Sequence, residues 1–182
     1  VVLVSIIIGL GITLVLSGIA QLLREEQRVK LFWPYLIWIV LVFVMHIHEW
    51  WITYQLKSTL AWRLPTFLFI ILYPILLFIL ANLLFPDSWE KYSRDTKHFY
   101  FVIYQNFFGC AILLVVLSVL QNVFLLDLPL TEQIVHFIVL ITLAVMLAAK
   151  LKSVLAHTII ALFLLLLLIG SLIVERNSLL IQ

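Results

Sequence analysis

Residues 159–168 read Ile-Ile-Ala-Leu-Phe-Leu-Leu-Leu-Leu-Leu, an unbroken apolar run with no polar residue inside it. A strand of a membrane β-barrel would alternate apolar and polar residues over about ten positions. Backbone groups in lipid must find their hydrogen-bond partners within the segment, which leaves the helix for this stretch. The run therefore predicts a membrane-spanning helix.

Similar stretches occupy most of the chain. Crossing a hydrocarbon core of about 30 Å takes about 20 mainly apolar helical residues. Hydrophobic residues make up 65% of the 182 residues and charged residues 11%, which is more apolar surface than a soluble domain of this size could bury. We predict an all-α, polytopic transmembrane bundle with short loops, in one domain covering 1–182. Its six spans are expected at about 1–23, 31–54, 67–86, 99–126, 133–151 and 154–174. Residues 18–20 loosely match a signal-peptide cleavage site, but no basic region precedes them, so we interpret the first stretch as a span.

Basic residues divide unequally between the two sides of the predicted bundle. Those in the odd-numbered loops are Arg24, Arg28, Lys30, Lys91, Arg94, Lys97, Lys150 and Lys152. Those on the other side are Lys57, Arg63 and Arg176. Because cytoplasmic loops carry the excess of lysine and arginine, the odd loops are predicted to be cytoplasmic, with both termini on the opposite side.

The first span carries small and polar residues at every fourth position. They are Ser5, Gly9, Thr13, Ser17 and Gln21. Residues four apart share a helix face, and small side chains let two helix backbones approach closely. Two interpretations follow: packing against another helix of the same subunit, or a subunit interface or pore lining. In either case we expect Gly9→Leu to disrupt assembly or folding.

Polar residues approach the predicted non-cytoplasmic side on spans two, four and five. The set comprises His46, Glu49, Thr53, Gln121 and His136. His46, Glu49 and Thr53 share one helix face through their spacing of three and four, whereas His48 points roughly the other way. Histidines two apart cannot easily grip one metal ion, so this is not a self-contained zinc motif. The alternatives are an interfacial or structural role, a proton or ion pathway, and a metal or haem site.

A second polar cluster belongs to the cytoplasmic half. Its members are Asn82, His98, Tyr104, Gln105 and Asn106, with His157 nearby. Such amides and phenols can hydrogen-bond across helices and fix their packing. The other interpretation is the lining of a vestibule or a small-molecule pocket.

Several classes of protein find no support. Cys110 is the only cysteine, so an internal disulfide or a thiolate metal cluster is excluded, and we expect a buried apolar thiol. The sequence holds no glycine-rich phosphate loop, no nucleophile elbow and no zinc-protease motif, which favours a non-enzymatic protein. Its few scattered basic residues do not support nucleic-acid binding. We expect no cofactor. If the protein bound haem through two histidines, only His46 and His136 could serve as the pair.

Four segments carry a resemblance. They are residues 5–12 (Ser-Ile-Ile-Ile-Gly-Leu-Gly-Ile), the tryptophans Trp33, Trp38, Trp50 and Trp51, residues 83–87 (Leu-Leu-Phe-Pro-Asp), and the aromatic stretch 98–108. In these segments the chain resembles a family of small uncharacterised bacterial six-helix inner-membrane proteins. The resemblance covers the first four spans. It implies a bacterial inner-membrane setting, and it transfers no activity and no catalytic residue.

Together, these features favour a self-associating integral membrane protein, with passage of ions or protons as the leading role. A membrane-embedded haem or metal redox protein is the alternative. A third option is an accessory or sensor subunit that contacts a membrane partner through an amphipathic surface helix at 87–97, where Glu90 and Arg94 are four residues apart.

Overall fold

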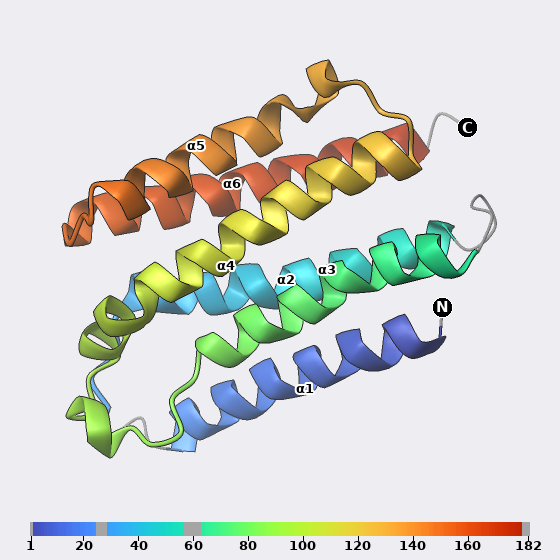
Figure 1. The fold of residues 1–182 in the computed structure, drawn as a ribbon. Helices are drawn as coiled ribbons and strands as arrows, with labels where there is room; N and C mark the ends of the chain where they lie inside the picture. Colours follow the sequence, from blue (N-terminus) through green and yellow to red (C-terminus); the bar gives the residue numbers. More distant parts are fainter. Residues whose placement is uncertain (1, 25–28, 57–62, 180–182) are drawn as a thin grey trace.

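The computed structural model describes residues 2–24, 29–56 and 63–179, with side chains described up to residue 171. Its six long helices confirm the predicted all-α architecture, and each is long and apolar enough to cross a membrane (Figure 1). Two short 3₁₀ segments, η1 at Glu90–Tyr92 and η2 at Leu130–Gln133, lie in the connections. The helices are α1 (Val2–Arg24), α2 (Trp33–Leu56), α3 (Leu64–Leu83), α4 (Thr96–Leu125), α5 (Ile134–Ala148) and α6 (Val154–Leu179).

Local sequence explains where these helices begin. Pro65 lies in the first turn of α3, where its missing N–H leaves no hydrogen bond unmade, so the helix begins three residues before the predicted span. Asp95 is the N-cap of α4, and its carboxylate accepts hydrogen bonds from the backbone N–H groups of Lys97 (2.8 Å) and His98 (3.4 Å). The fifth crossing combines η2 with α5.

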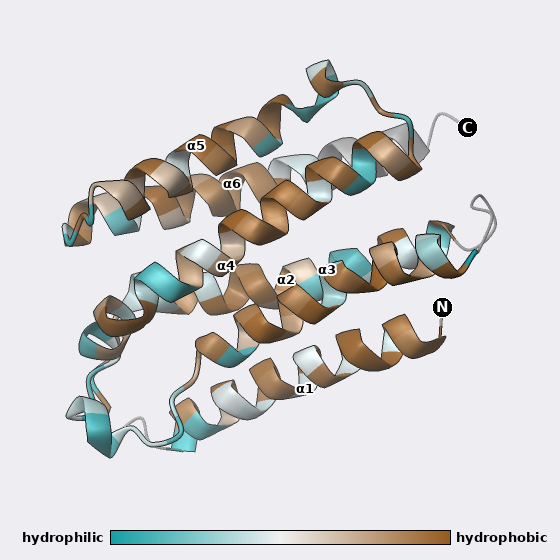
Figure 2. Cartoon of the chain, viewed as in Figure 1, coloured by the Kyte–Doolittle hydropathy of each residue, from teal (hydrophilic) through white to brown (hydrophobic). Residues whose placement is uncertain are grey.

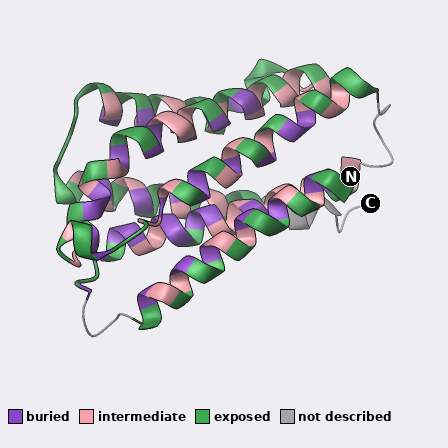
Figure 3. Ribbon diagram, turned by 60° about the horizontal axis from the view of Figure 1, so that its bottom comes forward, coloured by how far each residue is buried: buried purple, intermediate pink, exposed green. Residues whose placement is uncertain are grey.

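The helices form two groups, α1–α3 and α4–α6, which meet between α3 and α4 and between α2 and α6. Helix α1 packs against α3 and α2, α3 packs against α4, α4 against α5, and α6 chiefly against α2. The ribbon is apolar along the helices and hydrophilic mainly in the connections (Figure 2). Many large apolar side chains face outward, including Leu10, Leu72 and Leu166, while each helix buries a stripe against its neighbours (Figure 3). This outward apolar surface is what an integral membrane protein presents to lipid.

At one end of the bundle the connection before α2 is joined to the connection before α4. The backbone N–H of Lys30 donates to the carbonyl of Arg94 (2.8 Å), and the N–H of Thr96 donates to the carbonyl of Lys30 (3.1 Å). The N–H of Phe32 donates to the Thr96 hydroxyl (2.7 Å). These two loops therefore lie on the same side, as the predicted topology requires.

The predicted surface helix at 87–97 is wrong. Before α4 begins at Thr96, only Glu90–Tyr92 are helical there, and Ser93 and Arg94 adopt left-handed backbone conformations (φ 55° and 52°) that end this short segment. The expected ion pair between Glu90 and Arg94 does form, at 2.9 Å. The long hydrophilic stretch is therefore a turn that leads into the capped start of α4.

Candidate ligand-binding cavity

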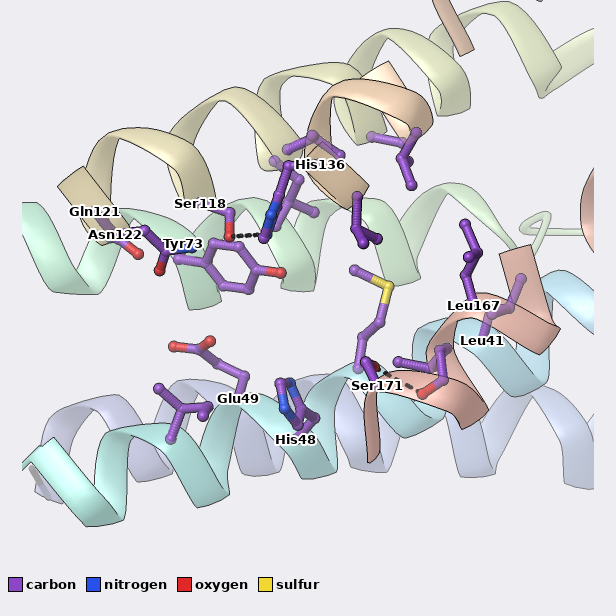
Figure 4. A pocket seen from close by; sticks show the side chains of 18 of the residues that line it. Leu41, His48, Glu49, Tyr73, Ser118, Gln121, Asn122, His136, Leu167 and Ser171 are labelled. Carbon is purple, nitrogen blue, oxygen red and sulfur yellow. Dashed lines mark hydrogen bonds between the residues drawn. The ribbon is translucent and has the colours of Figure 1, made fainter. Parts of the chain in front are cut away.

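A cavity of about 600 Å³ lies between α2 and α3 on one side and α4, α5 and α6 on the other. Its lining runs along α2 from Trp38 to Leu56 and along α4 from Phe107 to Leu125. Figure 4 shows side chains from these helices facing one another across the space. The volume falls within the range of small-molecule sites in proteins.

Polar side chains gather in the half of the cavity nearest the α2–α3 and α4–α5 connections. Glu49 of α2 faces the space, and the Thr53 hydroxyl donates to its Oε1 (3.3 Å). Tyr73 of α3 and His136 of α5 lie across from Glu49 in Figure 4. The polar side chains of the whole lining are His48, Glu49, Thr53, Tyr73, Ser118, Gln121, Asn122, Glu132, His136 and Ser171.

Several of these polar side chains also hold neighbouring helices together. His136 Nε2 and the Ser118 hydroxyl lie 3.1 Å apart, which links α5 to α4. The amide nitrogen of Gln121 donates to the backbone carbonyl of Phe69 on α3 (2.8 Å). The amide nitrogen of Asn122 donates to Gln133 Oε1 (2.8 Å). These bonds fix the walls of the polar half in position.

The other half of the cavity is apolar. Its lining includes Leu41 and Val42 of α2, Leu114 of α4, Leu143 of α5 and Leu164 of α6. Leu41 and Leu167 lie at the end opposite Gln121 and Asn122 in Figure 4. The cavity thus changes from polar to apolar along the direction of the helices.

Aromatic rings close the apolar end. Trp38 packs edge-on against Phe107, with ring centroids 5.2 Å apart, and lies 5.3 Å from Phe108. The Trp38 indole N–H donates to the Tyr100 hydroxyl oxygen at 3.1 Å. Tyr100 and Phe107 are fully buried. Contacts between side chains of α2 and α4 therefore close the apolar end of the cavity.

His157 extends this seal to α6. Its Nε2 lies 2.8 Å from the carbonyl of Leu151, which can only accept, so Nε2 carries a proton. In the neutral imidazole Nδ1 is then free to accept from the Tyr100 hydroxyl, 2.7 Å away. The resulting chain of donors runs from Trp38 through Tyr100 and His157 to Leu151. The rings of Phe101, Tyr104 and Phe108 surround the imidazole at 5.1–5.6 Å.

The prediction for His46 needs correction. Glu49, Thr53, Gln121 and His136 all line the cavity, but His46 faces α1, with its Nε2 2.1 Å from where a Cβ on Gly11 would lie. Its Nδ1 lies 2.7 Å from the carbonyl of Val42. Positions three apart differ by about 60° around a helix, enough to place two residues of one broad face in different compartments.

The same geometry bears on the haem and metal alternative. His46 faces α1 and His136 faces the cavity, so the two histidines do not converge as axial ligands would. Within the described part of the chain, no group of three histidine, cysteine or acidic side chains is placed to hold a metal ion. The cysteine, Cys110, is half-buried, and its thiol donates to the carbonyl of Leu76 at 3.7 Å.

The second predicted cluster does not assemble as a pocket. Tyr104 is buried against His157, and Gln105 donates to its hydroxyl at 3.3 Å. Asn82, His98 and Asn106 are exposed. Packing is therefore the role that Tyr104 and His157 have in this structure.

The ladder on the first span faces outward. Gly9, Thr13 and Ser17 are exposed and Ser5 is half-buried, so packing of this ladder within the subunit is wrong for its three central members. A Cβ on Gly9 would meet nothing within 4 Å. Contact between copies through this face stays a prediction. The close approach occurs instead at Gly11 and Gly18, which are buried.

Residues that the sequence reasoning did not assign to this site also line it. Ser118 lies three positions before Gln121 and four before Asn122, a spacing that could have revealed one polar face. Tyr73 is the only tyrosine of the third span. His48 also lines the cavity, contrary to the prediction that it points away from Glu49. The spacing of residues shows which of them share a helix face, but not how far around the helix a cavity extends.

Comparison with protein-family models, curated proteins and solved structures finds no match for this chain.

Proposed function

We propose that this integral membrane protein binds an amphiphilic small molecule in the cavity between α2–α3 and α4–α6. The headgroup would lie among the polar side chains near Glu49, Gln121 and His136. The hydrocarbon chain would extend toward Leu41 and Leu114, ending at Trp38.

The observation that carries this proposal is the polarity gradient within a single cavity of about 600 Å³. Ligand sites are mostly apolar, with a few convergent polar groups that fix orientation. An apolar half of this size gains nothing from holding an ion, whereas a hydrocarbon chain would fill it without leaving polar groups unpaired. The packed side chains of Trp38 and Tyr100 close the apolar end, where the hydrocarbon chain of the ligand would stop.

Other roles stay predictions. Passage of ions or protons would use the same Glu49, Gln121 and His136, but would require a path through the aromatic seal. Self-association, a bacterial inner-membrane location and cytoplasmic odd loops are likewise part of this proposal. A cofactor is not invoked.

Photolabelling tests the proposal directly. The protein would be placed in nanodiscs of defined phospholipid and exposed to an alkyl alcohol that carries a diazirine on its chain. After irradiation, mass spectrometry would map the labelled residues. We expect labelling at Trp38, Leu41 and Leu114 that excess dodecanol removes, together with non-saturable labelling of lipid-facing residues such as Leu166.

A matched pair of variants provides the control. Ala111 is buried at the cavity lining, so Ala111→Leu should fill part of the apolar half and reduce the saturable labelling severalfold. Ala144 of α5 is exposed, so Ala144→Leu should leave labelling unchanged. Labelling at the cavity that dodecanol does not reduce, or that Ala111→Leu does not weaken, would refute the proposal.

A further inference from the structure

The charge of the cavity lining has one sign. Among the described residues that line it, Glu49 and Glu132 carry formal negative charges and no lysine or arginine is present. Glu49 lies on α2, and Glu132 lies on η2 across the polar half. The two carboxylates therefore approach the same space from opposite groups of helices.

Glu49 is poorly compensated where it lies. The Thr53 hydroxyl, at 3.3 Å, is the one described side chain that donates a hydrogen bond to its carboxylate. The carboxylate projects from α2 toward Tyr73 and Ser118 rather than outward (Figure 4). An ionised carboxylate within a membrane segment is costly unless it takes up a proton or meets a partner of opposite charge.

A ligand could supply that partner. A positive headgroup would meet the Glu49 carboxylate within a site of low dielectric constant, where the attraction between charges is stronger than in water. The face of the Tyr73 ring can add a cation–π contact. Glu132 at the edge of the cavity would attract cations toward it. An anionic headgroup would meet two like charges and no cation.

We infer that the ligand of this cavity is a lipophilic organic cation, with its positive headgroup against the Glu49 carboxylate and its hydrocarbon chain in the apolar half. This inference rests on the proposed function, because it uses the same cavity. It adds the charge of the headgroup and the residue that recognises it.

Competition among three probes with the same chain tests the inference. Dodecyltrimethylammonium, dodecanol and dodecyl sulfate would each compete with the diazirine alcohol for the protein in nanodiscs. The concentration of each probe would be corrected for the amount that empty nanodiscs bind. We expect the cation to compete at about tenfold lower concentration than the alcohol, and the anion to compete least. In Glu49→Gln the preference for the cation should fall about tenfold, while competition by dodecanol is unchanged.

The variant Glu132→Gln is the matched control, since it removes a carboxylate from the exposed edge, and it should lower the preference less than Glu49→Gln. Equal competition by the cation and the alcohol, or an unchanged preference in Glu49→Gln, would overturn the inference and leave the proposed function standing. Failure of dodecanol itself to compete would refute the proposed function. If Glu49→Gln does not fold, the order of the three probes on the unsubstituted protein decides.

Discussion

Replacing Gly11 by alanine should destabilise the bundle, because this glycine makes room for the buried imidazole of His46. An ideal Cβ on Gly11 would lie 2.1 Å from Nε2 and 2.5 Å from Cδ2 of that ring. Ordinary contact begins at 3.4 Å, so the ring is too close by about 1.3 Å. Gly9, two residues away on the same helix, provides the matched control, since its Cβ would meet nothing within 4 Å.

The magnitude follows from the two ways the clash can be relieved. Forcing extra carbon into a packed interface costs about 1–3 kcal/mol. Rotating the ring instead breaks the contact between Nδ1 of His46 and the carbonyl of Val42, which lie 2.7 Å apart, at a cost of about 1 kcal/mol. The gain in helix propensity from glycine to alanine, about 1 kcal/mol on the aqueous scale, applies to both variants. Gly11→Ala should therefore be less stable than Gly9→Ala by about 1–3 kcal/mol, whichever way the clash is relieved.

Reversible unfolding of the purified protein by dodecyl sulfate in mixed micelles would measure the two free energies of unfolding. Adding His46→Ala should recover much of the loss in Gly11→Ala, because it removes the clashing ring, and a double-mutant cycle isolates this coupling. Equal stability of Gly9→Ala and Gly11→Ala, or no coupling between Gly11 and His46, would refute the assigned packing of α1 on α2.

Three further experiments test other parts of the structure. Tyr100→Phe removes the central hydroxyl of the buried hydrogen-bond chain, so Trp38 and His157 each lose a partner, and the free energy of unfolding should fall by about 1–3 kcal/mol. Tyr104→Phe, which removes only the contact with Gln105, should cost less. Equal losses in the two variants would contradict the hydrogen-bond chain. Asp95→Ala removes the N-cap of α4 and should cost about 1 kcal/mol in the same assay, with an unchanged value arguing against the cap. To test the topology, Lys91→Cys and Thr131→Cys should react with a membrane-impermeant thiol reagent from opposite sides of the bilayer, Lys91→Cys from the cytoplasmic side. Reaction of both variants from the same side would contradict the predicted orientation.

The polar residues of the cavity show which features of the site can be predicted from the sequence. Glu49, Gln121 and His136 were grouped because each approaches the same end of its span, and depth along a helix follows directly from position in the chain at 1.5 Å per residue. His46 was grouped with them by the same argument and faces α1 instead. Depth was predictable, whereas rotation about the helix axis was not, since it depends on which neighbouring helix packs against which face.

The glycines of α1 also show that spacing alone does not identify which helix face is buried. The ladder at Gly9 has the spacing of a packing face, yet it is exposed, while Gly11 and Gly18 lie on the buried face against His46 and Phe85. Small residues permit close approach without choosing the partner. The choice requires knowing that Phe85, two residues beyond the end of α3, packs against Gly18 of α1.

By itself, the sequence determined that the chain forms six membrane-spanning helices, because backbone satisfaction in lipid and the length of each apolar run are properties of the segment alone. Only the tertiary structure decided that two groups of helices part to leave a cavity, polar at one end and sealed by Trp38, Tyr100 and His157 at the other. Those contacts join residues on three different spans, more than fifty positions apart in the chain. They arise from shape and hydrogen bonding between helices, which no single span encodes.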